Sequence, residues 1–420
     1  MNVFTMILGG GIGRRLSVLG EPRGKAALPF GGKYRIVDFV LSNAVNSRLE
    51  HIAVLAQFSP QEMISHLGTG EPWGLNRGDQ PGIQLWMASA ERTGQVAYLS
   101  AANAVYQNRK DILAEGCDTV LILAGDHVYK QDFRDLLRFH QEKGADATVS
   151  SMRVPIEKAH RFGLMGVDDN QRIVQFEEQP QQPAQNLASL GIYVFNTAFL
   201  LEVLEKDAHD AVSRHDFGLN ILPKVAARGR AFAYPFNGYW EDVGNVQAYY
   251  ETHLALLEEA PPLDLFDPEW VIHTRLWQKP PVKIGPVGKV ERSLVSDGCV
   301  IHGEVAHSVL SPGVRVERGA VVRDSVILQD TVIRAGAVVD HCVVDEAVEI
   351  GAHASLGAGY ELAPNAEEPD ILNSGITVIG RGAVIPPGAV IGHNCRVDQN
   401  VVPRDFERME IPCGSTVHKK

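Results

Sequence analysis

A six-residue repeat of apolar residues limits the C-terminal part of the chain to a narrow range of folds. The interval holds over two stretches, at Val314, Ala320, Val326, Val332, Val338, Val344 and Ile350, and again at Ile379, Ile385, Ile391 and Val397. This period is typical of a left-handed parallel β-helix, in which one small or branched apolar residue of each short strand points into the core. Between the two stretches, the polar and proline-rich segment 357–373 predicts a loop inserted between coils.

A glycine-rich turn near the N-terminus indicates a backbone that wraps around a phosphate. The apolar run Val3–Leu8 predicts a strand, and Gly9–Gly13 follows it directly. Glycine lacks the side chain that would keep a phosphate away from backbone N–H groups. Taken alone, the glycines fit a plain strand-to-helix turn equally well, because they match neither the P-loop pattern nor a complete dinucleotide fingerprint.

Positive charge gathers next to this turn. In a chain whose net charge is −12, six cations lie close together: Arg14, Arg15, Arg23, Lys25, Lys33 and Arg35. An anionic substrate accounts for such a local concentration better than a solvated surface does.

The segments that follow predict a doubly wound α/β domain. Leu41–Arg48 has the pattern of a helix and His51–Gln57 that of a strand, and ligands of such domains bind beyond the carboxyl ends of the strands. Thr119–Leu123 predicts a buried strand that leads directly into Asp126. A carboxylate at this position suits Mg²⁺ bound to substrate phosphates. The alternative is that Asp126 caps a helix beginning near Lys130.

The length and the changes of pattern predict two domains. At 420 residues the chain exceeds one ordinary core. We expect an α/β domain over residues 1–255, a proline-rich linker over 256–289 and the β-helix over 290–420. Within the α/β domain, the pattern predicts a loop over Gly68–Gly82, a helix over Ala97–Asn108, a strand over Ala147–Arg153 and a β-hairpin over 162–178.

The composition excludes several classes of protein. The acidic balance argues against a nucleic-acid partner. No apolar run is long enough for a membrane span, and no signal-peptide pattern opens the chain, so we expect a cytoplasmic protein. The cysteines are scattered and odd in number, which fits free thiols rather than a disulfide framework or a zinc site: Cys117, Cys299, Cys342, Cys395 and Cys413.

Several motifs resemble those of one enzyme family. The run Ile7–Phe39 resembles the N-terminal signature of sugar-nucleotide pyrophosphorylases, and its part Phe30–Phe39 resembles the ADP-glucose pyrophosphorylase (glucose-1-phosphate adenylyltransferase) branch. Further motifs of that branch are similar to four segments: Ala124–His127, Ala188–Phe195, His215–Gly218 and Tyr239–Gly244. The resemblance implies a Rossmann-like nucleotidyltransferase domain before the β-helix. It also implies synthesis of ADP-glucose and pyrophosphate from ATP and glucose 1-phosphate, for glycogen or α-glucan formation.

The resemblance also implies the site residues. The backbone at Gly10, Gly11 and Gly13 would bind the nucleotide phosphates, and Arg15 and Lys25 would stabilise the departing phosphates, with Asp126 as the third catalytic residue. Asp126 and Asp242 would hold one Mg²⁺ ion. The remaining substrate-binding residues would be Tyr98, Gly163, Glu178, Gln179, Ser189 and Gly191. At Asp216, in the motif His215–Gly218, an N-cap of a helix is as good an explanation as a substrate contact.

The chain departs from the family pattern in three places. Gln179 stands where the family has a lysine that binds the sugar phosphate, so this contact loses its charge. Ala97–Ala104 lacks an arginine and an acidic residue of the family motif but keeps Tyr98, and Met87–Ser89 replaces the segment that helps to recognise the base. An active enzyme with a modified site, a regulatory subunit that needs an active partner, and a transferase for another base or sugar therefore all remain open.

Two further expectations concern the β-helix. Some hexapeptide-repeat acyltransferases use a histidine, so acyl transfer is a minor alternative, for which histidines such as His302, His307, His341 and His353 are available. The resemblance implies instead that the β-helix packs against the catalytic domain, joins subunits into a homotetramer or a hetero-oligomer with a paralogue, and hosts an effector such as a sugar phosphate or nucleotide.

Overall fold

The computed structural model describes residues 1–20, 23–57, 60–76, 82–88 and 97–420. The chain forms two compact units. The first consists of Met1–Gly11, Phe39–Trp240 and Trp270–His273, and the second of Ile12–Asp38, Glu241–Glu269 and Thr274–Lys420. The glycine-rich turn therefore crosses from the first unit into the second.

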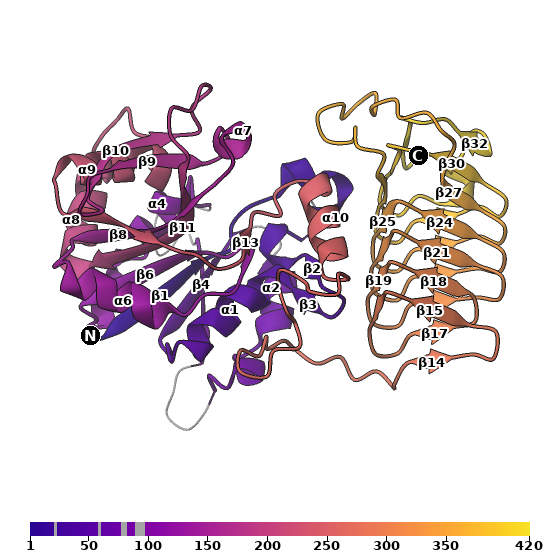
Figure 1. The fold of residues 1–420 in the computed structure, drawn as a ribbon, viewed down its shortest axis with the longest axis horizontal. Helices are drawn as coiled ribbons and strands as arrows, with labels where there is room; N and C mark the ends of the chain where they lie inside the picture. The colour runs from indigo at the N-terminus through magenta and orange to yellow at the C-terminus, as the bar shows by residue number, and fades with distance from the viewer. Residues whose placement is uncertain (21–22, 58–59, 77–81, 89–96) are drawn as a thin grey trace. The chain divides into compact units, whose positions relative to one another are not determined.

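The first unit contains a mixed sheet (Figure 1). Its strands are β1 (Val3–Leu8), β4 (Ile52–Ala56), β5 (Gln84–Met87), β6 (Thr119–Ala124), β8 (Ala147–Arg153), β9 (Gly163–Val167), β10 (Ile173–Glu178), β11 (Leu187–Asn196) and β12 (Ala231–Pro235). The order is β10-β9-β11-β6-β1-β4-β5, with β8 between β11 and β12. Because β1 is parallel to both β4 and β6, the carboxyl ends of these three strands meet at one edge.

The helices of the described residues are short. They are α1 (Ile36–Asn46), α2 (Pro60–Leu67), α4 (Ala101–Gln107), α5 (Arg109–Ala114), α6 (Phe133–Glu142), α7 (Ile156–Ala159), α8 (Thr197–Ala208), α9 (Leu222–Ala227) and α10 (Val246–Ala255). None of these described helices combines the length and the apolar character that crossing a bilayer requires. The linker segment Trp270–His273 packs on α1, where Trp270 Nε1 donates to Asn43 Oδ1 at 2.9 Å.

The predicted elements of the first unit mostly match the observed ones. The strand over Ala147–Arg153 and the β-hairpin of β9 and β10 are confirmed. The helix predicted from Leu41 begins earlier, at Ile36, because Asp38 accepts the Arg35 N–H at 2.8 Å and stabilises the first turn. The helix predicted from Ala97 begins at Ala101. Part of the predicted loop Gly68–Gly82 lies outside the described residues.

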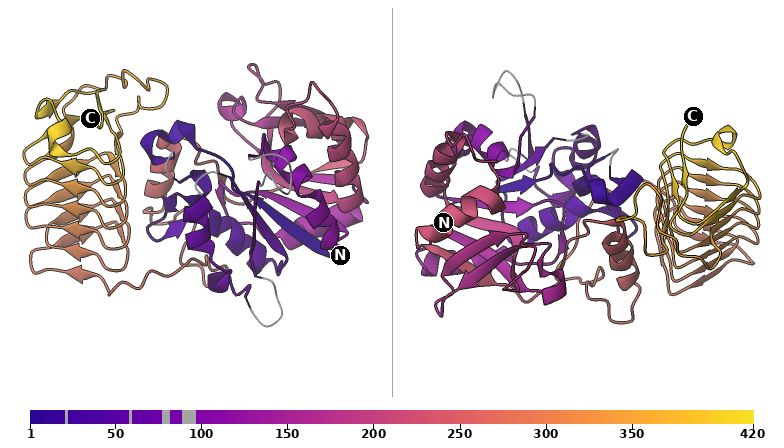
Figure 2. Two further views of the ribbon diagram at one scale, coloured as in Figure 1. Left: turned by 180° about the vertical axis from the view of Figure 1, so that it is seen from behind. Right: turned by 90° about the horizontal axis from the view of Figure 1, so that it is seen from above.

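The second unit contains the β-helix, whose coils stack along one direction (Figure 2). One ladder is β14 (Lys283–Ile284), β17 (Val300–Ile301), β20 (Arg315–Val316), β23 (Val332–Ile333), β26 (Glu349–Ile350) and β29 (Val384–Ile385). The second is β15 (Lys289–Glu291), β18 (Glu304–Ala306), β21 (Val321–Arg323), β24 (Val338–Asp340), β27 (Ser355–Ala358), β30 (Val390–Gly392) and β32 (Glu410–Ile411). The third is β16 (Leu294–Val295), β19 (Val309–Leu310), β22 (Val326–Ile327), β25 (Cys342–Val344), β28 (Thr377–Ile379), β31 (Arg396–Val397) and β33 (Thr416–Val417).

The β-helix confirms the predicted architecture and corrects the predicted period within the first of its two stretches. Val332 and Val338 are only partly buried, whereas their neighbours Ile333 and Val339 are fully buried. The interior residues follow at intervals of five or six: Val316, Val322, Ile327, Ile333, Val339, Val344 and Ile350. Val322 pairs with Val339, so a coil takes seventeen residues here, and the strict interval of six leaves the core at Val332 and Val338. The second predicted stretch keeps the interval of six, because Ile379 pairs with Val397 and the side chains at Ile379, Ile385, Ile391 and Val397 are fully buried.

The predicted loop between coils is confirmed. Residues 359–376 form no strand, and they separate β27 from β28. The ladder continues across the insertion, because Cys342 pairs with Thr377. Long insertions at a turn leave the stacked coils intact.

Small elements carry the segment Ile12–Asp38 of the second unit. They are the 3₁₀ turns Arg14–Leu19 and Lys25–Ala27 and the strands β2 (Pro29–Phe30) and β3 (Tyr34–Arg35). Helix α10 holds this segment, because Tyr249 donates from its hydroxyl to the Pro29 carbonyl at 2.5 Å and the Gly31 N–H donates to His253 Nε2 at 3.2 Å. Two further short strands are β7 (Val128–Tyr129) and β13 (Trp240–Glu241).

Candidate active site

A cavity of about 460 Å³ lies in the first unit, at the carboxyl ends of β1, β4 and β6. Six of the predicted site residues line it: Gly10, Gly11, Tyr98, Asp126, Glu178 and Gly191. Ligands of parallel sheets bind at this edge. The sequence prediction of a site beyond these strand ends therefore agrees with the position of the cavity.

The glycines of the cavity allow close packing of backbone at the strand ends. Gly125 donates its N–H to the Leu8 carbonyl at 3.0 Å, and a Cβ at Gly125 would lie only 3.0 Å from that oxygen. A Cβ at Gly11 would lie 3.8 Å from Asp126 Oδ2, so the glycine turn runs directly past this carboxylate. A phosphate that approaches the turn would therefore also approach Asp126.

Asp126 does not cap a helix. Helix α6 begins at Phe133 and is capped by Asp132, whose carboxylate accepts the Arg134 N–H at 2.9 Å. The Asp126 side chain is 28% exposed, and its Oδ1 lies 3.6 Å from His127 Nε2. A partly exposed carboxylate in a cavity fits the hard oxygen ligands that Mg²⁺ prefers.

Glu178 also lines the cavity. It ends β10, and its carboxylate packs on two glycines, since a Cβ at Gly163 would lie 2.5 Å and one at Gly218 2.1 Å from Oε2. Burial, with a smaller contribution from Asp216, raises the pKa of Glu178 to about 7. The side chain is therefore poised to donate or accept hydrogen bonds near neutral pH.

Four predicted substrate-binding residues are not among those that line this cavity: Gly13, Gly163, Gln179 and Ser189. Gly163 lies behind Glu178, and Ser189 lies within β11, where its Oγ accepts the Gly191 N–H at 3.5 Å. Gln179 is exposed, has a left-handed backbone (φ 46°), and donates its N–H to the Phe162 carbonyl. The predicted substrate contacts of all four residues stay predictions.

The segment that departs from the family pattern borders the cavity. Leu99, Ser100 and Ala101 are among the lining residues, and Leu99 is 66% exposed. The Ser100 hydroxyl donates to the His215 carbonyl, and the Asn103 side chain accepts the Leu99 N–H at 3.0 Å. In the other departing segment Met87 is exposed, and Ser89 lies outside the described residues.

Two lining residues extend the predicted set. Gln57 follows β4, and its Oε1 accepts the Tyr98 N–H at 3.1 Å. The signal for it was present, because a polar residue at the end of a parallel strand has the same position as Asp126. Asp216 combines both alternatives of the sequence: it caps the following turn by accepting from Gly218 and Leu219, and it lines the cavity.

A cluster of catalytic candidates lies in the second unit. Lys25 Nζ lies 2.6 Å from Asp242 Oδ1, and both side chains are largely buried. Gly244 gives room to this pair and to Arg15, since a Cβ at Gly244 would lie 2.8 Å from Asp242 Oδ1 and 3.1 Å from Arg15 Nη2. Because Asp126 belongs to the first unit, the Mg²⁺ ion shared by Asp126 and Asp242 stays a prediction.

The turn before this cluster depends on glycine. Gly13 has a left-handed backbone with φ 73°, and its carbonyl accepts the Leu16 N–H at 2.8 Å. A Cβ at Gly20 would lie 2.3 Å from the Gly13 carbonyl, so both positions exclude a larger residue.

The six clustered cations differ in their exposure to solvent. Arg23 is fully buried and paired with Asp345, and Arg35 is buried with its Nη1 donating to the Ala27 carbonyl at 2.6 Å. The interpretation of the cluster as a site for an anionic substrate therefore does not extend to these two side chains, because their guanidinium groups are buried and donate to Asp345 and to the Ala27 carbonyl. Arg15 is exposed.

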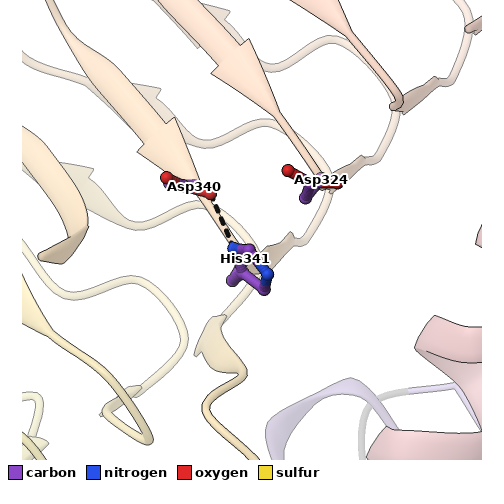
Figure 3. A group of neighbouring side chains, drawn as sticks. All are labelled: Asp324, Asp340 and His341. Atoms are coloured by element: carbon purple, nitrogen blue, oxygen red, sulfur yellow. Dashed lines mark hydrogen bonds and ion pairs between the residues drawn. The ribbon is translucent and has the colours of Figure 1, made fainter. Parts of the chain in front are cut away.

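A group of side chains on the β-helix also has metal-binding residue types (Figure 3). One donor atom from each of Asp324, Asp340 and His341 lies within 4.8 Å of the others. These donors already have partners: His341 Nδ1 lies 2.7 Å from Asp340, Arg323 Nε 2.6 Å from Asp340, and His307 Nδ1 2.6 Å from Asp324. Because these internal pairs balance much of the charge, we assign neither a metal nor an acyl-transfer role to the group.

Comparisons with known proteins agree with these observations. The family model "Nucleotidyl transferase" matches residues 4–259, and "GlmU-like, C-terminal hexapeptide" matches residues 282–379. A glucose-1-phosphate adenylyltransferase of Thermomicrobium roseum is 47% identical over 418 residues, covering 99% of this chain and 98% of its own. Proteins of the same name from Acetivibrio thermocellus and Thermotoga maritima are 42% and 43% identical with the same coverage. With its strand-end cavity and its β-helix, the chain belongs to the glucose-1-phosphate adenylyltransferase (ADP-glucose pyrophosphorylase) family of nucleotidyltransferases.

Proposed function

We propose that this chain, without an active partner, transfers the adenylyl group of ATP to glucose 1-phosphate and releases pyrophosphate. The observation that carries the proposal is the cavity at the strand ends, where the glycine turn runs past the Asp126 carboxylate. The product, ADP-glucose, would supply glycogen or α-glucan synthesis. Family membership supports the reaction class and the substrates.

The proposed reaction needs positioning and neutralisation of charge more than covalent chemistry. An oxygen of glucose 1-phosphate attacks the α-phosphorus of ATP, and the bond to the β-phosphate breaks as pyrophosphate leaves. Backbone N–H groups at Gly10, Gly11 and Gly13 would bind the nucleotide phosphates. Arg15 and Lys25 would neutralise the charge that grows on the departing pyrophosphate. Glu178 would bind hydroxyl groups of the sugar.

The acidic residues fit a magnesium ion. Asp126 is a partly exposed carboxylate in the cavity, and Asp242 is a carboxylate that forms an ion pair with Lys25. We propose that these two residues hold Mg²⁺, which when bound neutralises phosphate charge and favours attack at the α-phosphorus. The contact between Lys25 and Asp242 places a cation beside a carboxylate before substrate binds.

The regulatory-subunit alternative is less well supported. A chain that only transmits regulation has no chemical need for two carboxylates and two cations in these positions, yet Arg15, Lys25, Asp126 and Asp242 are all present. The full-length relatives named above carry the name of the enzyme itself. On this view, Gln179 and the segment after Tyr98 modify the substrate site but do not abolish its activity.

Three further proposals concern the assembly, the regulation and the location of the protein. We propose a homotetramer or a hetero-oligomer, an effector of sugar-phosphate or nucleotide type, and a cytoplasmic location. These rest on the family resemblance and not on a surface or cavity of this chain.

Pyrophosphate release by the purified chain tests the function. With ATP, glucose 1-phosphate and Mg²⁺, we expect release by the wild type and a loss of about 100-fold or more in Asp126→Asn, because the lost charge removes several kcal/mol of metal-based stabilisation. Asp132→Asn is the matched control, since Asn also caps helix α6. Absence of release by the wild type at high glucose 1-phosphate would contradict the proposal and favour the regulatory subunit.

A further inference from the structure

A fully buried ion pair joins the segment Ile12–Asp38, which contains the predicted phosphate ligands Arg15 and Lys25 and is called the phosphate-binding segment below, to the β-helix. Arg23 Nη1 and Nη2 each donate to Asp345 Oδ1 at 2.9 Å, and Nη2 also donates to Oδ2 at 3.1 Å. Both side chains are 0% exposed. Burial disfavours the charge of Arg23, but Asp345 and then Glu346 outweigh it and raise the pKa of the guanidinium, so it stays charged.

The β-helix holds Asp345 rigidly. Asp345 follows β25, donates its N–H to the Ile379 carbonyl at 2.9 Å, and accepts the Thr331 hydroxyl at its carbonyl at 2.8 Å. Its Oδ1 also accepts the Glu346 N–H at 2.7 Å. The carboxylate is therefore held by neighbouring coils of the ladder, and the geometry of a two-pronged contact transmits that position to the guanidinium.

Arg23 lies close in sequence to a catalytic candidate. Only Gly24 separates it from Lys25, and Gly24 donates its N–H to the Gly20 carbonyl at 3.0 Å. Lys25 in turn contacts Asp242. Consecutive Cα atoms are about 3.8 Å apart, so fixing Arg23 restrains where Lys25, two residues further along, can lie.

Other contacts dock the same segment on the β-helix. Ser17 donates from its hydroxyl to Glu368 at 2.5 Å, and Gln399 Nε2 donates to the Val18 carbonyl at 2.9 Å. Gly32 lies against Ser296, since a Cβ at Gly32 would lie 2.6 Å from its hydroxyl oxygen. These contacts are more exposed or single-pronged, so the pair of Arg23 and Asp345 is the strongest geometric restraint among them.

We propose that Asp345, a residue of the β-helix, is a positioning residue for adenylyl transfer: through its buried contact with Arg23 it places Lys25 for neutralising the departing pyrophosphate. The inference rests on the proposed role of Lys25. A displacement of about 1 Å lowers the rate strongly in reactions that depend on positioning. The β-helix is then a part of the catalytic apparatus and more than a platform for assembly.

Two variants of the pair test the proposal in the full-length chain. Asp345→Asn leaves a buried guanidinium without its counter-charge and is expected to lower both the melting temperature and kcat. The double variant Arg23→Met with Asp345→Leu removes both charges and fills the site with apolar groups, which commonly keeps stability. We expect kcat of the double variant to fall about tenfold, with the KM for glucose 1-phosphate within about twofold, because Lys25 acts on the pyrophosphate.

A matched control separates positioning from general stability. Asp405 is a buried carboxylate of the β-helix that accepts the Val402 N–H at 2.8 Å and belongs to neither the Arg23–Asp345 contact nor the contact of Lys25 with Asp242. Asp405→Asn is expected to lower the melting temperature and to leave kcat unchanged below that temperature. If the double variant melts like the wild type and keeps its full kcat, the proposal is overturned.

The dependence on Lys25 separates this proposal from the proposed function. Lys25→Ala alone should lower kcat, and Asp345→Asn should lower it no further in the Lys25→Ala background, because both act through one contact. Full activity of Lys25→Ala would refute the catalytic role of Lys25 itself. A low activity of Lys25→Ala with a further, multiplied loss from Asp345→Asn would refute only the positioning role of Asp345.

Discussion

The cores of the two units differ in the kinds of side chain that fill them. The buried core of the first unit contains large aromatic side chains among its members: Phe4, Trp86, Tyr98, Phe176, Phe195 and Phe217. The buried members of the described β-helix core are instead valine, isoleucine, leucine, alanine and cysteine. Stacked coils present the same narrow space again and again, so side chains of similar size recur.

The difference explains where a ligand site arises. Strands and helices of unequal length meet in the first unit, and large and small residues together leave a cavity at the strand ends. In the β-helix each layer repeats the one before and is filled by its own apolar residues. The stacked coils of the β-helix instead provide a rigid support, and this support holds Asp345 in position for its contact with Arg23.

The largest effect that we expect concerns which residues of the β-helix point into its core. Ile333→Ala should lower the free energy of unfolding of the β-helix by about 2–5 kcal/mol, because the side chain is fully buried. Val332→Ala should cost less than about 1 kcal/mol, because that side chain is only partly buried. Denaturant unfolding, with a probe that follows the β-helix transition, measures both. An equal cost at the two positions would restore the strict six-residue period.

The second prediction concerns the modified sugar-phosphate contact in the first unit. Gln179→Lys should lower the KM for glucose 1-phosphate by about five- to tenfold, because a charge-assisted contact with phosphate is stronger than a neutral one by about 1 kcal/mol. Gln175→Lys, at an exposed position of strand β10, which ends just before Gln179, is the control for general attraction of anions. Steady-state kinetics compares the two. The same fall in both variants would contradict a specific contact at residue 179.

Glu178 gives a smaller effect, through pH. Its pKa in the folded chain, about 7, lies above the ordinary value of 4.5. The folded state therefore keeps a proton that the unfolded state has lost, and the contribution of Glu178 to stability falls as the pH rises from 4.5 through about 7. The melting temperature of Glu178→Gln should exceed that of the wild type at about pH 8 and match it near pH 4.5. A constant difference across this range would count against the buried carboxyl.

His253 in the second unit should show the opposite dependence. Burial lowers its pKa from 6.5 to about 4, and its Nε2 accepts the Gly31 N–H, which requires the neutral ring. The unfolded state therefore gains a proton first, so stability is fully present above pH 6.5 and is lost as the pH falls through about 4. Melting curves of the wild type and His253→Gln across this range should converge towards low pH. Parallel curves would show that His253 does not titrate with unfolding.

The sequence predicted those parts of the site that follow from local rules. A strand that ends in a glycine turn, and a strand that ends at Asp126, must present backbone N–H groups and a carboxylate at the same edge of a parallel sheet. The cavity lies at this edge. Gln57 was overlooked although the same rule covers it, and the position of Gln179 relative to a ligand does not follow from any local rule.

Several strands of the α/β domain, the β-helix and the position of the glycine turn after β1 could be predicted from the sequence, because each depends on residues that are near one another along the chain. Only the tertiary structure decided which of the clustered cations reach solvent. Arg23 and Arg15 have the same charge and lie in one segment, yet Arg23 is buried against Asp345, 322 positions away. The register of the β-helix was decided in the same way, since seventeen-residue coils select Ile333 over Val332. In both cases the energy depends on partners brought together by folding, and a local pattern contains no information about them.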